Sequence, residues 1–143
     1  MIGMPLWSGL ETVQSFTMYQ SNSLDAEMED QPDNSSRLCL GCHDGSDTHL
    51  TGGSADLGTD LSRSHPISFV YDSDLANVDS GLKDPSEQST LGGTITEDLL
   101  DPEQKMQCIS CHEVHSSGIG DKMMRGYDYD TQGSEFCRMC HLQ

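Results

Sequence analysis

CISCHEVH, residues 108–115, holds two cysteines three positions apart, a histidine directly after the second, and another histidine three positions later. Cys-x-x-Cys-His is the attachment signature of a c-type haem: the two thiols bond to the porphyrin and the adjacent histidine coordinates the iron. Cys108, Cys111 and His112 fit this signature, whereas His115 has no place in it. The stretch therefore predicts a haem attachment unit followed by a histidine with a separate task.

The same signature occurs three times and uses every cysteine of the chain. Zinc sites and disulfide frameworks also use Cys-x-x-Cys pairs, but neither needs a histidine after each pair. With six histidines in 143 residues, a histidine at all three places is not expected by chance. We therefore expect three covalently attached haem c groups with their irons. The attachment residues are Cys39, Cys42 and His43 in unit 1, Cys108, Cys111 and His112 in unit 2, and Cys137, Cys140 and His141 in unit 3.

Apolar side chains are scarce in this chain. Leu, Ile, Val and Phe together account for 26 of 143 residues, and the formal net charge is −17. Composition alone would predict a disordered chain. Haem changes that expectation, because each group is a large apolar body, tied to the backbone, around which the chain can condense. We expect a compact multihaem cytochrome c fold, mostly irregular with short α-helices and little sheet, organised around three haems.

The expected organisation is a single triheme domain over residues 1–143. Residues 1–36 contain no haem unit and form an N-terminal arm, and residues 37–80 form the first haem lobe. Residues 81–104, with a Gly-Gly step and Asp-Pro steps at either end, are predicted to be a surface connection. Residues 101–143 form the second and third haem lobe.

The best helix candidate is residues 101–115, with Asp101 at the N-cap and a proline at the first helical position. In such a helix His112 and His115 lie about one turn apart on the same side. His115 then serves a different haem from that of His112, and the haem of His141 is the natural choice.

Two other segments carry local expectations. The proline after His65 disfavours helix there and predicts an extended segment. The acidic stretch DYDTQG, residues 128–133, partly resembles a calcium-binding loop, but its twelfth position is Met139 where such a loop has Glu. An ordinary turn is predicted instead.

The histidine count predicts the axial ligands. Three irons that each hold the histidine of their own unit need three more ligands, and three histidines remain: His49, His65 and His115. Eight methionines compete for these places, but methionine ligation would leave histidines unused, so bis-histidine ligation is favoured. The predicted iron ligands are His43, His49, His65, His112, His115 and His141.

The segments PLW, LCLGCHDG, SHPISFVYDSDLA, QCISCHEVH and FCRMCH resemble the bacterial multihaem cytochromes c of the doubled-CxxCH class, which include subunits of extracellular cytochrome filaments. The resemblance implies that His65 and His115 are distal ligands. It also implies a further haem unit ahead of the PLW segment, which this chain lacks. His49 is the expected substitute for the distal ligand that such a unit would supply.

Electron transfer is the leading functional expectation, because irons with both axial places filled have no site for a substrate. The chain is then not an enzyme but a carrier in periplasmic or extracellular anaerobic respiration, and as a further expectation a subunit of a conductive filament. The alternative is a multihaem reductase or gas sensor with one five-coordinate haem.

The charge of the chain and its targeting signals limit which partners and which cellular location we expect. With 24 acidic against 7 basic side chains, nucleic acid is not an expected partner. Other redox proteins, or copies of the chain itself in a homopolymer, are expected instead. The sequence contains no membrane span and no signal peptide. Because haem attachment of this kind follows export, we expect a leader that is not present in this chain.

Overall fold

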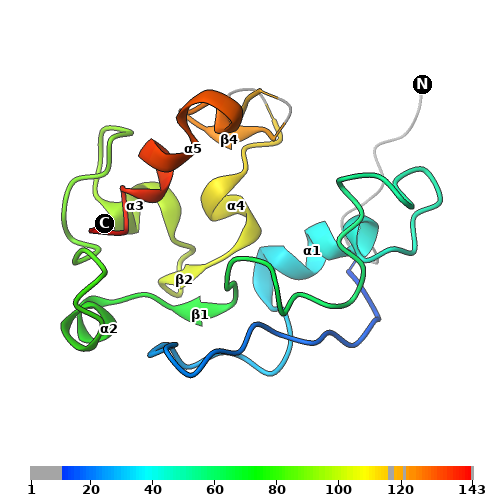
Figure 1. Cartoon of the computed structure of the whole chain (residues 1–143), viewed down its shortest axis with the longest axis horizontal. Helices are drawn as coiled ribbons and strands as arrows, with labels where there is room; N and C mark the ends of the chain where they lie inside the picture. Colours follow the sequence, from blue (N-terminus) through cyan, green and yellow to red (C-terminus); the bar gives the residue numbers. More distant parts are fainter. Residues whose placement is uncertain (1–10, 116–117, 121, 143) are drawn as a thin grey trace.

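The computed structural model describes residues 11–115, 118–120 and 122–142. Within these ranges the chain forms short helices and two-residue strands joined by turns and irregular segments (Figure 1). The expectation of a mostly irregular fold with short helices and little sheet is confirmed. No helix in the described ranges is long and apolar enough to cross a membrane. In chain order the elements are α1 (Asn34–His43), β1 (Phe69–Val70), α2 (Ser73–Val78), α3 (Ile95–Leu99), β2 (Lys105–Met106), α4 (Cys108–Cys111), β3 (Gly118–Ile119), β4 (Met124–Arg125) and α5 (Tyr129–Cys137).

Helix α1 carries the first haem unit at its C-terminal end. Its N-cap, Asp33, follows a proline and has an extended backbone. Ser36 and Leu40, four residues apart and therefore on one face, are both buried. After His43 the helix stops, because Gly45 adopts a φ of +88°, the left-handed conformation that glycine tolerates at helix ends. The sequence thus places unit 1 at a helix terminus.

The predicted long helix over residues 101–115 is wrong. Asp101 does not cap a helix but accepts hydrogen bonds from the backbone N–H groups of Glu103 and Lys105, each at 2.9 Å, and so closes a turn. The chain then enters β2, which pairs antiparallel with β1. Only the four residues of α4 are helical in this segment.

Residues 81–104 contribute more than the predicted surface connection. Helix α3 starts with a capping box, in which Thr94 Oγ1 accepts from the N–H of Glu97 and Glu97 Oε2 accepts from the N–H of Thr94. Ile95 and Leu99 lie one turn apart on this helix and are 0% and 4% exposed. This part of the expectation is wrong, because α3 belongs to the hydrophobic core.

The acidic stretch over residues 128–133 is neither a calcium loop nor a simple turn but the start of α5. Asp128 caps this helix by accepting a hydrogen bond from the N–H of Asp130 at 3.0 Å. The helix is kinked at Gln132, whose dihedral angles are not helical. Its last residue is Cys137, so unit 3, like unit 2, begins inside a helix and ends beyond it, whereas unit 1 ends with its helix at His43.

Buried apolar side chains form two clusters. The smaller one joins the arm to α1, because Phe16 and Met18 pack with Leu40 and Leu61. The larger one lies among α2, α3, α5 and the short strands, with α1 and the loop after it at the other end of the molecule (Figure 1). Its members are Phe69, Tyr71, Leu75, Ile95, Leu99, Met106, Met124, Phe136 and Met139.

Candidate haem-binding site

One turn of backbone gathers the three functional groups in units 2 and 3. The N–H of His112 donates to the carbonyl of Cys108, and the N–H of His141 donates to the carbonyl of Cys137, both at 3.0 Å. A turn of this kind brings the first cysteine and the histidine of a unit to the same side. None of the six cysteines, all of which lie in the described ranges, is in a disulfide. In the part of the chain that the structure describes, no three Cys, His, Asp or Glu side chains converge on a metal position.

Two of the unit histidines have a ring nitrogen fixed by a backbone carbonyl. His43 Nδ1 lies 2.7 Å from the carbonyl oxygen of Ala55, and His112 Nδ1 lies 2.6 Å from that of Lys122. A carbonyl oxygen can only accept, so Nδ1 carries the proton in each ring. The other nitrogen, Nε2, is then the basic one and is available to a metal.

The thiols of successive units lie near one another. The Cys108 thiol raises the pKa of Cys39, and the contact with Cys39 in turn lowers the pKa of Cys108. Burial raises the pKa of Cys111 to about 12, and the thiol of Cys140 adds to that increase. Unit 2 therefore lies between units 1 and 3, as Figure 1 shows for α4 between α1 and α5.

His65 lies beside the histidine of unit 3. The ring centroids of His65 and His141 are 6.3 Å apart, with an angle of 76° between the ring planes. Two imidazoles bound to opposite sides of one metal ion, through metal–nitrogen bonds of about 2 Å, have centroids about 6 Å apart. His65 Nδ1 lies 2.9 Å from the carbonyl oxygen of Pro66, which leaves its Nε2 available. The pair therefore has the separation of two axial ligands of one iron.

His115 and His112 are not related by a helical turn. Helix α4 ends before His112, whose ψ of 130° is extended, so the one-turn prediction is wrong. The structure brings His65, rather than His115, beside His141.

His115 and His49 share a different local arrangement. In each case a carboxylate two positions earlier, Glu113 or Asp47, accepts a hydrogen bond from the histidine's backbone N–H at 2.9 or 2.8 Å. The same oxygen lies 3.2 or 3.1 Å from Nδ1 of the ring. The side chains are 76% and 92% exposed. Both histidines are therefore oriented by an acid and open to solvent at Nε2.

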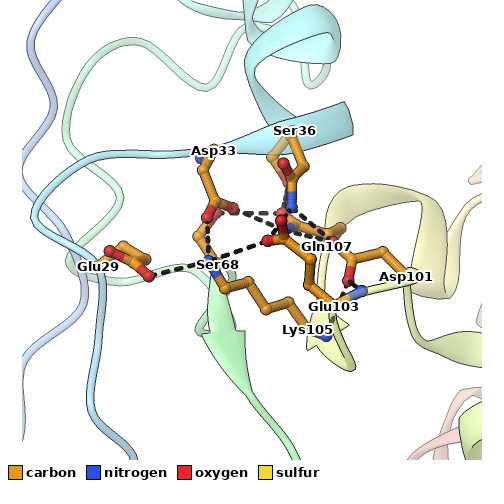
Figure 2. A network of polar contacts seen from close by, with 9 residues as sticks. Glu29, Asp33, Ser36, Ser68, Asp101, Glu103, Lys105 and Gln107 are labelled. Carbon is orange, nitrogen blue, oxygen red and sulfur yellow. Dashed lines mark hydrogen bonds and ion pairs between the residues drawn. The ribbon is translucent and has the colours of Figure 1, made fainter.

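A buried glutamine next to unit 2 was not anticipated from the sequence. Gln107 is 1% exposed, and its Oε1 accepts hydrogen bonds from Ser36 Oγ at 2.6 Å and Ser68 Oγ at 3.1 Å. Its Nε2 donates to Asp33 Oδ1 at 2.7 Å and Asp101 Oδ2 at 3.0 Å. Both acceptor positions and both donors of the amide are thus used. We call these five residues, drawn in Figure 2, the Gln107 node.

The ammonium group of Lys105 borders the Gln107 node. Lys105 Nζ lies 2.5 Å from Asp33, 2.9 Å from Glu29 and 3.4 Å from Glu103 (Figure 2). Burial raises the pKa of Asp33, but hydrogen bonds from Lys105 and Gln107 outweigh it and the net shift is downward. The pKa of Asp101 is likewise lowered, because backbone and side-chain donors outweigh the effect of burial. The node is therefore built around two ionised carboxylates.

These shifts predict loss of stability in acid. Each carboxyl has a native pKa below its unfolded value of about 3.9, so its contribution is fully present above that value and is lost as pH falls through the native pKa. We expect the free energy of unfolding of the holoprotein, measured by denaturant titration, to fall below about pH 4. Asp33→Asn should flatten this acid dependence, whereas Asp25→Asn, at an exposed position, should not. Equal acid dependence in the two variants would contradict the assignment to Asp33.

The comparisons with known proteins concern the C-terminal part of the chain. The family model of the doubled CXXCH motif matches residues 101–143, which contain units 2 and 3 and make up less than a third of the sequence. A search of curated proteins found no match. The CXXCH motifs indicate covalently bound haem c with iron. The doubled motif supports a c-type cytochrome of the multihaem class.

Proposed function

We propose that the chain is a triheme cytochrome c that transfers electrons through closely spaced bis-histidine haems. The observation that carries the proposal is the gathering of successive attachment thiols: Cys39 contacts Cys108, and Cys111 and Cys140 pack against the same buried cluster. Porphyrins bonded to neighbouring thiols have edges close together, and electron exchange between haems falls steeply as the gap widens. The order of electron flow is then unit 1, unit 2, unit 3, or the reverse.

The pair of His65 and His141 supports bis-histidine ligation of the third haem. An iron with both axial places filled gains and passes electrons but binds no substrate, which is why we propose a carrier and not an enzyme. Two neutral nitrogen ligands favour a low reduction potential, which suits anaerobic respiration in the periplasm or outside the cell.

Haem content tests the proposal directly. The holoprotein, produced in a host that attaches haem c, should have the mass of the polypeptide plus three haems. Its pyridine haemochrome spectrum should be that of thioether-linked haem, and a redox titration should account for three electrons per chain. A protein that retains zinc and lacks a Soret band would overturn the proposal.

A reductase or gas sensor is the second candidate. It is favoured by the exposure of His49 and His115, because histidines so open to solvent leave the irons of units 1 and 2 with an open axial place in a single copy. Carbon monoxide separates the two functions. The carrier binds none when reduced, whereas a five-coordinate haem binds it and shifts its Soret band.

In a filament, His49 and His115 could be exposed in a single copy and every iron could still have both axial ligands. In this form of the proposal, His49 and His115 complete the irons of neighbouring copies, and an acid two residues earlier holds each ring ready. A head-to-tail contact that does not close makes a filament. The charge of −17 opposes association until salt screens it.

Sedimentation tests the filament. We expect large assemblies at moderate salt that dissociate at low ionic strength, because repulsion between acidic copies is then unscreened. His115→Ala should weaken assembly and make a haem high-spin. The matched substitution Val114→Ala, at a neighbouring exposed position, should do neither. A wild-type protein that stays monomeric at moderate salt with every haem low-spin would rule out ligation between copies.

A further inference from the structure

One hydroxyl joins the first two haem units. Ser36, on α1, is 0% exposed. Its Oγ donates to Oε1 of Gln107 at 2.6 Å and accepts a hydrogen bond from the backbone N–H of Cys108 at 3.0 Å. Cys108 is the first attachment residue of unit 2, and 71 to 72 positions of sequence separate the partners. The hydroxyl therefore fixes the backbone of unit 2 to the helix that carries unit 1.

The position of Ser36 on α1 makes this contact relevant to the haems. Ser36 precedes Cys39 by three residues, so the two side chains emerge on the same side of the helix. The Cys39 thiol in turn meets the Cys108 thiol. A hydrogen bond at Ser36 thus holds the two helices together directly beside the pair of thiols to which two haems attach.

Ser68 provides an internal comparison. It is also 0% exposed, and its Oγ donates to the same Oε1 of Gln107 at 3.1 Å. Its second contact is with the backbone N–H of Asp33, at 3.0 Å, and not with Cys108. Removing either hydroxyl therefore deprives Gln107 of one donor, but of these two hydroxyls only that of Ser36 accepts a hydrogen bond from an attachment residue.

We propose that Ser36 is a positioning residue that sets the gap between the haems of units 1 and 2. This inference rests on the proposed electron-transfer function. The helices α1 and α4 carry one attachment pair each, and α4 is a single turn of four residues. Without the bond from Cys108 to Ser36, α4 shifts relative to α1, and the two porphyrins change their distance and angle. In this role Ser36 acts through the backbone of Cys108.

The test compares Ser36→Ala with Ser68→Ala in the holoprotein. Neighbouring haems give a paired positive and negative Soret signal in circular dichroism, whose size depends on their distance and angle. A reference variant without unit 1, Cys39→Ala with Cys42→Ala, defines the signal that remains when haems 1 and 2 cannot interact. Ser36→Ala should keep all its haems, by mass, and move the paired signal toward that reference. Ser68→Ala should lose a similar amount of thermal stability but keep the wild-type signal.

Each outcome of this comparison supports or overturns the positioning role of Ser36. An unchanged paired signal in Ser36→Ala, or an equal change in Ser68→Ala, overturns the positioning role. If Ser36→Ala yields no holoprotein, Ser36→Thr, which keeps a hydroxyl, should restore both haem content and the paired signal. Failure of that rescue while the haem content returns also overturns it. A wild-type protein without haem on units 1 and 2 would contradict the proposed function itself, so the two failures are distinguishable.

Discussion

The Gln107→Glu variant should lose about 3–5 kcal/mol of unfolding free energy, the cost typical of a buried charge left without compensation. The exchange keeps the shape of the side chain but replaces the NH₂ group, which donates to Asp33 and Asp101, with an oxygen that can only accept. Three carboxylates then meet in a space that is 1% exposed at the substituted residue. Denaturant unfolding of the holoprotein at neutral pH measures the loss.

The pH dependence of this variant identifies the cause. An introduced carboxyl among two others has a raised pKa, so acidification protonates it and should narrow the difference from wild type, even as both proteins weaken. Gln20→Glu, which adds the same charge at an exposed position, should cost less than about 0.5 kcal/mol. A loss as small for Gln107→Glu as for Gln20→Glu would show that the amide is not a structural centre.

Sequence signals predict the structure correctly at places where the conformation depends on neighbouring residues alone. The proline after His65 predicted a non-helical segment, and this histidine lies in an irregular segment ahead of β1. Composition alone predicts a disordered chain, whereas the observed elements are ordered but short, because few faces are apolar enough to stabilise long ones. The capping box at Thr94, with Ile95 and Leu99 one turn apart, was an equally local signal for α3. The Gly-Gly and Asp-Pro steps around it predict a surface connection instead, and this competing signal conceals the helix.

The helix predicted over residues 101–115 failed for a reason outside the segment. Asp101 followed by proline is a strong helix start, but propensity is weak when distant partners compete. Here β1, more than 30 positions away, pairs with β2 and holds the chain extended. Once the helix is lost, the one-turn relation of His112 to His115 is lost with it.

No periodic pattern in the sequence predicts the Gln107 node. The partners of Gln107 lie 71, 39, 74 and 6 positions away, and Ser, Gln and Asp are common surface residues. A polar residue directly before a haem unit is as readily explained by exposure as by burial. Only the packing of α1 on α4 shows that Gln107 is buried and not exposed.

The largest effect on the haems is expected from His65→Ala. If His65 and His141 are the two axial ligands of the third iron, as their 6.3 Å separation suggests, the variant keeps this haem attached through its thiols but leaves one axial place open. The iron becomes high-spin, its reduced form binds carbon monoxide, and its reduction potential rises because a basic nitrogen ligand is gone. Visible spectroscopy with and without carbon monoxide measures the change.

Two comparisons assign the effect to one haem and one histidine. His115→Ala, the same substitution at an exposed histidine, should leave the third haem low-spin, because His115 is not the residue that the structure places beside His141. Combining His65→Ala with Cys137→Ala and Cys140→Ala removes the third haem and should abolish the carbon monoxide signal. If the signal persisted, His65 would serve unit 1 or unit 2, and its closeness to His141 would be packing alone. If His115→Ala instead opened the third haem, the sequence-based pairing of His115 with His141 would hold and the arrangement proposed for His65 would fail.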